Sequence, residues 1–184
     1  MKSGNDPQSE LSMPGSSARV PDMAGERQRT TRERFPPKRW ASGTIRVTGR
    51  FSAPPERVFD AWLDVKVAGR WLFATASRPM TDVEIDPRVA GSFRLANGCG
   101  GELTEYRGQF MEIARARRLV FNLSLNGLTV ITRVTVEIVP LSKGSCLTLT
   151  HQNVPHDRRN YLEQRWTGIL YGLGVALSDP KCPP

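Results

Sequence analysis

The sequence is poor in the residues that most often hold metals or form disulfides. Its 184 residues include three cysteines, Cys99, Cys146 and Cys182, and two histidines, His151 and His156. An odd number of cysteines without CxxC spacing indicates neither a disulfide framework nor a zinc site. Imidazole-based acid–base catalysis would depend on one of the two histidines. We therefore expect no metal and no cofactor.

Long apolar runs are also missing. No stretch approaches the ~20 consecutive apolar residues that a membrane span requires, and residues 1–30 lack the apolar segment of a secretory signal. The same residues include several acids, which transit peptides avoid. We therefore expect a cytoplasmic protein with reduced thiols.

The N-terminal region contains too few apolar side chains to build a core. Residues 1–43 mix Ser, Gly, Pro, Arg and Glu, and the apolar residues among them are isolated. Such a segment cannot offset its ordering entropy. We predict a disordered basic tail over 1–43, a domain over 44–178 and a short C-terminal tail over 179–184. Met13 and Met23 leave the native start of the chain open.

Charge alone does not indicate a nucleic-acid partner. The chain has 26 basic and 18 acidic residues, a net charge of +8, spread over both the tail and the domain. The basic run from Arg27 to Trp40 could touch nucleic acid or an acidic partner, but solvated charge runs are commoner. A nucleic-acid partner is therefore not expected.

The pattern from residue 44 onward predicts a strand, helices, six strands and a long helix. Residues 44–51 alternate as in a strand, and helical spacing follows from Val58 to Leu72, with Gly69 expected to divide it. Period-two patterns separated by turn residues predict the later strands. These strands are expected over 83–85, 91–95, 104–113, 119–125, 128–139 and 146–152.

The last apolar stripe has the spacing of an amphipathic helix over residues 157–177, with Leu162, Trp166, Ile169, Leu170 and Leu173 on one side. A curved antiparallel sheet that wraps around this helix would bury the stripe. We therefore predict an α+β helix-grip fold, with two short helices after the first strand and a long C-terminal helix.

Several blocks of the sequence carry a family resemblance. They include Phe51-Ser52-Ala53-Pro54-Pro55-Glu56-Arg57-Val58-Phe59-Asp60-Ala61-Trp62, Arg70-Trp71, Glu84-Ile85-Asp86-Pro87-Arg88, Gly91-Ser92-Phe93-Arg94, Tyr106-Arg107-Gly108-Gln109-Phe110, Arg117-Arg118-Leu119-Val120-Phe121, Val134-Thr135-Val136-Glu137 and Leu147-Thr148-Leu149-Thr150-His151. With these blocks in order, residues 44–177 resemble the START-like (SRPBCC) superfamily, in the branch similar to the C-terminal domain of activators of the heat-shock protein 90 ATPase. The resemblance implies the helix-grip fold. Members bind lipids, hormones or polyketides, and some are enzymes.

This chain departs from the usual pattern of that branch at two positions. Leu72 stands where a second tryptophan commonly follows the one matching Trp71, and Ala90-Gly91 stands for the usual Gly-Gly. The resemblance therefore implies that the mouth of the cavity differs. A heat-shock-protein partner is carried over only weakly, because the full co-chaperones have a second domain.

We hypothesise that the chain binds a small apolar or amphipathic ligand in a cavity between the sheet and the C-terminal helix. His151 shares strand parity with Leu147 and Leu149 and should face Trp166 across the gap between sheet and helix. An aromatic-rich set of residues is expected to line the cavity. The candidates are Trp62, Trp71, Phe93, Tyr106, Phe110, Phe121, Val134, His151, Trp166 and Leu170.

Two alternatives stay open. A cyclase- or hydrolase-type enzyme would need His151, Tyr106 or Glu84 to converge inside the same cavity. A co-chaperone-like interaction module would instead expose a contiguous apolar or charged patch to a protein partner or a second copy of the chain. No catalytic residue is assigned. The alternating carboxylates Asp82, Glu84 and Asp86 could suggest a metal or an acid pair, but carboxylates at an exposed strand edge are usually solvated. The loop cysteine Cys99 has no neighbouring base.

Overall fold

The computed structural model describes residues 42–75, 78–99, 102–125 and 131–178. Of the predicted tail over 1–43, residues 1–41 lie outside the described residues, as do the C-terminal residues 179–184. The first strand begins at Ser42, two residues before the expected boundary.

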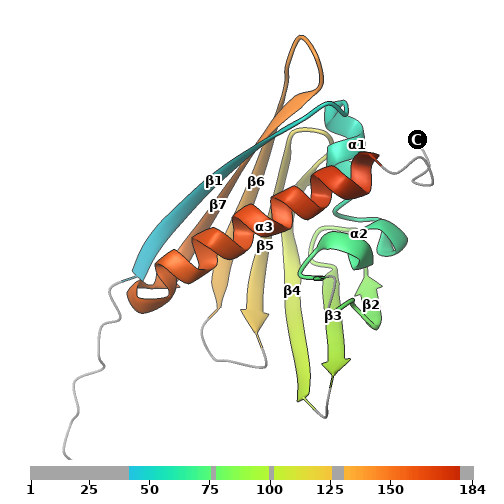
Figure 1. The fold of residues 1–184 in the computed structure, drawn as a ribbon. Coiled ribbons are helices and arrows are strands. Elements are labelled where there is room, and N and C mark those ends of the chain that lie inside the picture. Colours follow the sequence, from blue (N-terminus) through green and yellow to red (C-terminus); the bar gives the residue numbers. More distant parts are fainter. Residues whose placement is uncertain (1–41, 76–77, 100–101, 126–130, 179–184) are drawn as a thin grey trace, which may run out of the picture. The chain divides into compact units, whose positions relative to one another are not determined.

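The domain is a seven-stranded antiparallel sheet crossed by a long helix (Figure 1). The strand order in the sheet is β1-β7-β6-β5-β4-β3-β2, so the first strand pairs with the last and the remaining strands form a meander. The strands are β1 (Ser42–Phe51), β2 (Asp82–Ile85), β3 (Ser92–Cys99), β4 (Glu102–Ala114), β5 (Arg118–Leu125), β6 (Thr132–Pro140) and β7 (Ser145–Pro155). This architecture confirms the predicted α+β helix-grip fold.

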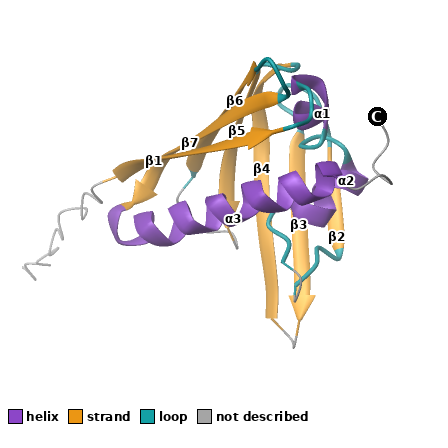
Figure 2. Ribbon diagram, turned by 45° about the horizontal axis from the view of Figure 1, so that its top comes forward, coloured by secondary structure: helices purple, strands orange, loops and turns teal. Residues whose placement is uncertain are grey.

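The sheet twists strongly along this order. Figure 2 shows β1 and β7 running obliquely along the C-terminal helix, whereas β3 and β4 cross beneath it at a steep angle. Register shifts in the β1–β7 and β4–β5 pairs accompany this twist, between Gly43 and Ile45 and between Phe110 and Glu112. The sheet therefore presents a concave face to the helix.

The C-terminal helix α3 (Arg159–Ser178) follows a single 3-10 turn over His156–Arg158 and covers the concave face. Its buried side is the stripe that helical spacing predicts. The stripe packs on the inward side chains of the central strands, which alternate along β7 as Leu147, Leu149 and His151. One core therefore lies between the sheet and α3.

Two short helices follow β1, as expected, but they divide at a different place. Helix α1 (Pro55–Asp60) ends before a turn, and α2 (Val65–Trp71) begins after Asp64. The Asp64 carboxylate accepts hydrogen bonds from the backbone N–H groups of Lys66 and Val67, at 2.8 and 3.1 Å, which caps α2. The predicted break at Gly69 is therefore wrong, because this N-cap starts a new helix and Gly69 lies inside it.

Pairing between β3 and β4 continues further than the turn residues suggest. Asn97, Gly98 and Cys99 lie beyond the strand expected over 91–95, but they extend β3 and pair with Thr104, Leu103 and Glu102 of β4. Antiparallel pairing overrides the weak strand preference of Asn and Gly. Cys99 therefore ends a strand.

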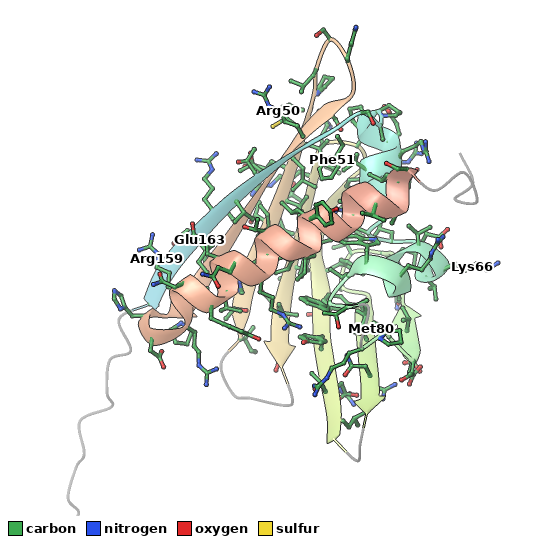
Figure 3. All side chains as sticks on the ribbon, in the orientation of Figure 1. Arg50, Phe51, Lys66, Met80, Arg159 and Glu163 are labelled. Carbon is green, nitrogen blue, oxygen red and sulfur yellow. The ribbon has the colours of Figure 1, made fainter. Side chains whose placement is uncertain are left out.

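The hairpin between β6 and β7 turns at Lys143-Gly144, between the strands expected over 128–139 and 146–152. Gly144 has a φ of +86°, and a Cβ there would lie 2.0 Å from the carbonyl oxygen of Phe51. The buried Ser145 hydroxyl donates to the carbonyl oxygen of Ala53 at 2.9 Å. Both contacts fix the end of β1 against this hairpin. Figure 3 shows Phe51 there directed toward α3.

Candidate functional site

The ten residues expected to line a cavity are all part of the core. Each is at most 5% exposed. They come from every layer of the domain: Trp62 and Trp71 from the α1–α2 region, Phe93 from β3, Tyr106 and Phe110 from β4, Phe121 from β5, Val134 from β6, His151 from β7, and Trp166 and Leu170 from α3. The structure brings most of them into two groups on the concave face.

The first group is an aromatic cluster under α1 and α2. The rings of Trp62 and Trp71 meet edge to face at 4.8 Å, and Phe121 contacts Trp62, Phe93 and Phe110. Trp71 Nε1 donates to the carbonyl oxygen of Ala61 at 3.2 Å, whereas the buried Nε1 of Trp62 has no partner in the part of the chain described. This cluster is mainly packing, with one unsatisfied donor inside it.

The second group joins α3 to the sheet. Trp166 Nε1 donates a 2.9 Å hydrogen bond to Nδ1 of His151, and the two rings stand edge to face at 5.8 Å. His151 is 2% exposed, and its Nε2 has no partner among the described residues. The inward side of α3 and the inward side of β7 are thus joined by one polar contact, the Trp166–His151 hydrogen bond, within an apolar core.

Burial fixes the protonation state of this histidine. Desolvation lowers the pKa of His151 from 6.5 to about 4. The ring is therefore neutral at physiological pH, and a neutral imidazole has one donor and one acceptor nitrogen. Because an indole N–H can only donate, Nδ1 is the acceptor. Nε2 then carries the hydrogen, and this buried N–H group lacks an acceptor.

A stacked pair of rings lies next to Trp166. Phe73 stacks on Tyr106 with ring centres 4.1 Å apart and planes 8° apart, and it also contacts Trp166 at 5.5 Å. Phe73 has a φ of +60°, which costs a non-glycine residue conformational energy. The backbone between α2 and β2 is thus bent so that the Phe73 ring can reach the sheet.

Arg165, beside Trp166 on α3, reaches the other end of this stack. Its guanidinium donates to the hydroxyl of Tyr106 and, at 3.1 Å, to that of Tyr161, and it lies 5.4 Å from the Tyr106 ring centre. Burial raises the pKa of Tyr106, which therefore stays protonated. Consecutive residues of α3 thus hold two strands, β7 through Trp166 and β4 through Arg165.

Sequence reasoning missed Phe73 and Arg165. Phe73 follows a helix in a stretch without periodicity, so no pattern marks its ring as inward. Arg165 is adjacent to the stripe residue Trp166, and a long charged side chain at such a position commonly covers apolar surface. That position was the only signal for Arg165.

Two grooves flank α3. One, of about 590 Å³, lies between α3 and the segment from Arg70 to Thr75, and Trp71 and Phe73 form part of its wall. The other, of about 800 Å³, lies between α3 and the end of β1 with the two residues after it, and Leu170 forms part of its wall. Glycines of α3 border both: Gly168 and Gly172 the first, Gly174 the second.

Carboxylates are engaged at the surface of the sheet. Asp82 pairs with Arg94, which also binds Glu105, and Asp86 pairs with Arg88 at 2.8 Å. Glu84 is exposed on β2.

Over the described ranges, no three His, Cys, Asp or Glu side chains group as metal ligands would. Within the same residues, no helix is long and apolar enough to cross a membrane.

The fold and the packed helix define a class, the helix-grip α+β domains. The family model for Activator of Hsp90 ATPase homolog 1-like protein matches residues 52–178. This chain belongs to that family, which is consistent with the START-like resemblance of its sequence blocks.

Solved structures share this fold. Protein CV1439 from Chromobacterium violaceum is 26% identical, with a TM-score of 0.67 over 74% of this chain and 97% of that one. The AHSA1-like protein from Aeromonas hydrophila is 21% identical, with a TM-score of 0.65 over 73% of this chain and 92% of that one. CalU16 from Micromonospora echinospora is 21% identical, with a TM-score of 0.57 over 74% and 77%. The search of curated proteins gave no match.

Proposed function

We propose that this protein binds a small, mostly apolar molecule between the concave face of the sheet and α3, and that His151 is its hydrogen-bonding contact. The ligand would carry a neutral acceptor, such as a carbonyl or ether oxygen. The other cavity candidates, from Trp62 to Leu170, would supply apolar area. The location of such a protein in the cytoplasm stays a prediction.

The observation that supports this proposal is the buried Nε2–H of His151. A buried donor without a partner costs about 1 to 3 kcal/mol, and buried polar groups in native proteins are almost always satisfied. The ring is held by Trp166, so it cannot rotate to another partner without breaking that bond. A ligand acceptor, or an internal water, would remove the cost.

An enzymatic function of the same region has less support. His151 lies on β7 and Tyr106 on β4, with β6 and β5 between them. Three strand spacings amount to about 14 Å. Each of the two side chains is already bonded to α3, and Glu84 is on the exposed side of β2. The three residues that an acid–base mechanism would need are therefore separated.

Native mass spectrometry of the freshly purified chain tests the proposal, together with titration of prodan, a neutral naphthyl ketone. We expect either a copurified small molecule or one-to-one prodan binding with blue-shifted emission. If no molecule copurifies and prodan does not bind, the proposal is overturned. A crystal structure in which Nε2 of His151 bonds only to a trapped water would also overturn it.

A pair of variants isolates the contribution of His151. Trp166→Phe removes the indole donor, and the double variant Trp166→Phe with His151→Leu removes both polar groups without leaving an unpaired one. Prodan should bind the double variant about 2- to 10-fold more weakly than the single variant, while naphthalene, which has no acceptor, should not distinguish them. Equal prodan affinities would show that His151 does not contact the ligand.

A further inference from the structure

The groove between α3 and residues 70–75 has a polar end and an apolar body. Arg165 lies at the polar end, and the apolar body includes Trp71, Ile169 and Val175. Gly168 lines the same groove, and a Cβ placed on it would meet nothing within 4 Å. The groove of about 590 Å³ is within the ~300 to 1,000 Å³ typical of small-molecule sites.

Arg165 supplies hydrogen-bond donors at the polar end, and the two tyrosines that it binds lie behind it, outside the described lining of the groove. A guanidinium has five N–H donors and no acceptor, and those of Arg165 bind two tyrosine hydroxyls. A hydroxyl that accepts from arginine keeps its own proton to donate. The O–H groups of Tyr106 and Tyr161, and the remaining N–H groups of Arg165, are therefore donors for which the described residues supply no further acceptor.

No Asp or Glu is among the described residues that line the groove. Arg165, at its polar end, therefore has no carboxylate partner within that lining. The positively charged groups that act on the Tyr106 hydroxyl are Arg165 and Arg78, and the Tyr161 hydroxyl acts on it in the opposite direction. Glu163, two residues before Arg165, lies with Arg159 near the N-terminal end of α3, away from α2 (Figure 3).

We infer that this groove binds an anionic amphipath, a carboxylate attached to an apolar chain, with the carboxylate on Arg165 and the chain along Gly168 and Gly172. A planar guanidinium matches a carboxylate in charge and geometry. The two glycines give the chain direct access to the backbone of α3, next to Trp71. The site differs from the internal one proposed above in its polar contact, because His151 does not line the groove, although Trp71 belongs to both.

Decanoate and decanol, which differ in the head group, test the inference by isothermal titration calorimetry on the full chain. Decanoate should bind one-to-one and at least about 10-fold more tightly than decanol, because hydrogen bonds to charged groups are stronger than neutral ones. Equal affinities, or the absence of decanoate binding, would overturn the inference.

Arg165→Gln should remove the preference for decanoate and leave decanol affinity unchanged. Arg159→Gln is the matched control, because it removes the same charge from the same helix at a position away from the groove. A similar loss in both variants would indicate a general effect of net positive charge and would overturn the assignment to Arg165.

Gly168→Leu tests the groove independently of its charge. Leucine has open space at this exposed helix position, so the fold should be kept while the side chain fills the groove. Binding of decanoate and decanol should both fall at least 10-fold. Gly174→Ala, in the groove on the other side of α3, should bind both as the unchanged chain does. Undiminished binding to the Gly168→Leu variant would place the ligand elsewhere.

The double variant at Trp166 and His151 should retain decanoate binding even if the internal site is lost.

Discussion

At the scale of single residues, His151 is the group whose state most affects the domain. Its position on β7 directs its side chain toward the core. Its Nδ1 accepts a hydrogen bond from Trp166, which requires that the imidazole ring be neutral. Protonation of Nδ1 would make both the imidazolium of His151 and the indole N–H of Trp166 hydrogen-bond donors, so the two groups would repel each other at a site that is almost fully buried. The bond between sheet and helix is therefore sensitive to acid.

Stability should fall as the pH drops from 7 to 5 because of this histidine. Its pKa is 6.5 in the unfolded chain and about 4 in the folded one, so the unfolded state binds the extra proton within this range. Linkage gives a loss of about 2 kcal/mol between pH 7 and pH 5, with further loss down to about pH 4. Urea unfolding at several pH values measures it.

The control is the double variant in which Trp166→Phe and His151→Leu remove the pair. Its unfolding free energy should change much less between pH 7 and pH 5, where ordinary carboxylates stay ionised. A pH dependence equal to that of the unchanged chain would show that other groups cause it.

At the scale of elements, glycines have opposite roles on α3 and on the sheet. Gly168 is exposed in the interior of a helix with nothing near its missing Cβ, whereas Gly108 on β4 lies where a Cβ would come within 2.2 Å of both the Asn122 carbonyl oxygen and the Phe93 ring. The first glycine is a local weakness in the helix. The second allows β4 and the aromatic cluster to pack closely.

Alanine substitutions should separate these roles. Gly168→Ala should raise the free energy of unfolding by about 1 kcal/mol, the usual difference in helix propensity. Gly108→Ala should lower it by about 2 kcal/mol or more through overpacking. Thermal or urea unfolding of both variants measures the effects, and a stabilising Gly108→Ala would contradict the observed packing.

Most of the elements could be predicted from the sequence, because their patterns are local. The strands after residue 82 and the stripe of α3 follow from periodicity. The division between α1 and α2 could not be placed, because the Asp64 cap competes with Gly69 as a boundary signal. The end of β3 could not be placed either, because pairing with β4 outweighs the turn preference of Asn97-Gly98.

The candidate site was only partly predictable. Strand parity and helical spacing put His151 and Trp166 on facing surfaces, where the structure joins them directly. The patterns do not indicate which nitrogen of the His151 ring lacks a hydrogen-bond partner, because that depends on the orientation of the ring. Phe73 depends on a backbone turn with positive φ, and Arg165 on the distance from α3 to Tyr106. Both are properties of tertiary packing and have no signature in spacing.

At the scale of the whole molecule, the tail and the domain are expected to be independent. We propose that residues 1–43, apart from the start of β1, contribute nothing to the core. Deleting residues 2–40 should therefore change the melting temperature by less than about 5 °C, which corresponds to 1 to 2 kcal/mol for a domain of this size. Differential scanning calorimetry of both forms measures the change, and a larger drop would show that the tail is packed.

The pairing of β1 with β7 sets the order in which the domain can be completed during synthesis. Ser42 pairs with Pro155 and Phe51 with Ser145, so the strand that β1 pairs with in the described sheet is made only after about a hundred further residues. Helix α3, which covers β1, is made later still. The meander from β2 to β6 can assemble from contacts close in sequence, whereas closing so long a loop is slow. A nascent chain that stops before Ser145 therefore lacks the strand with which β1 pairs.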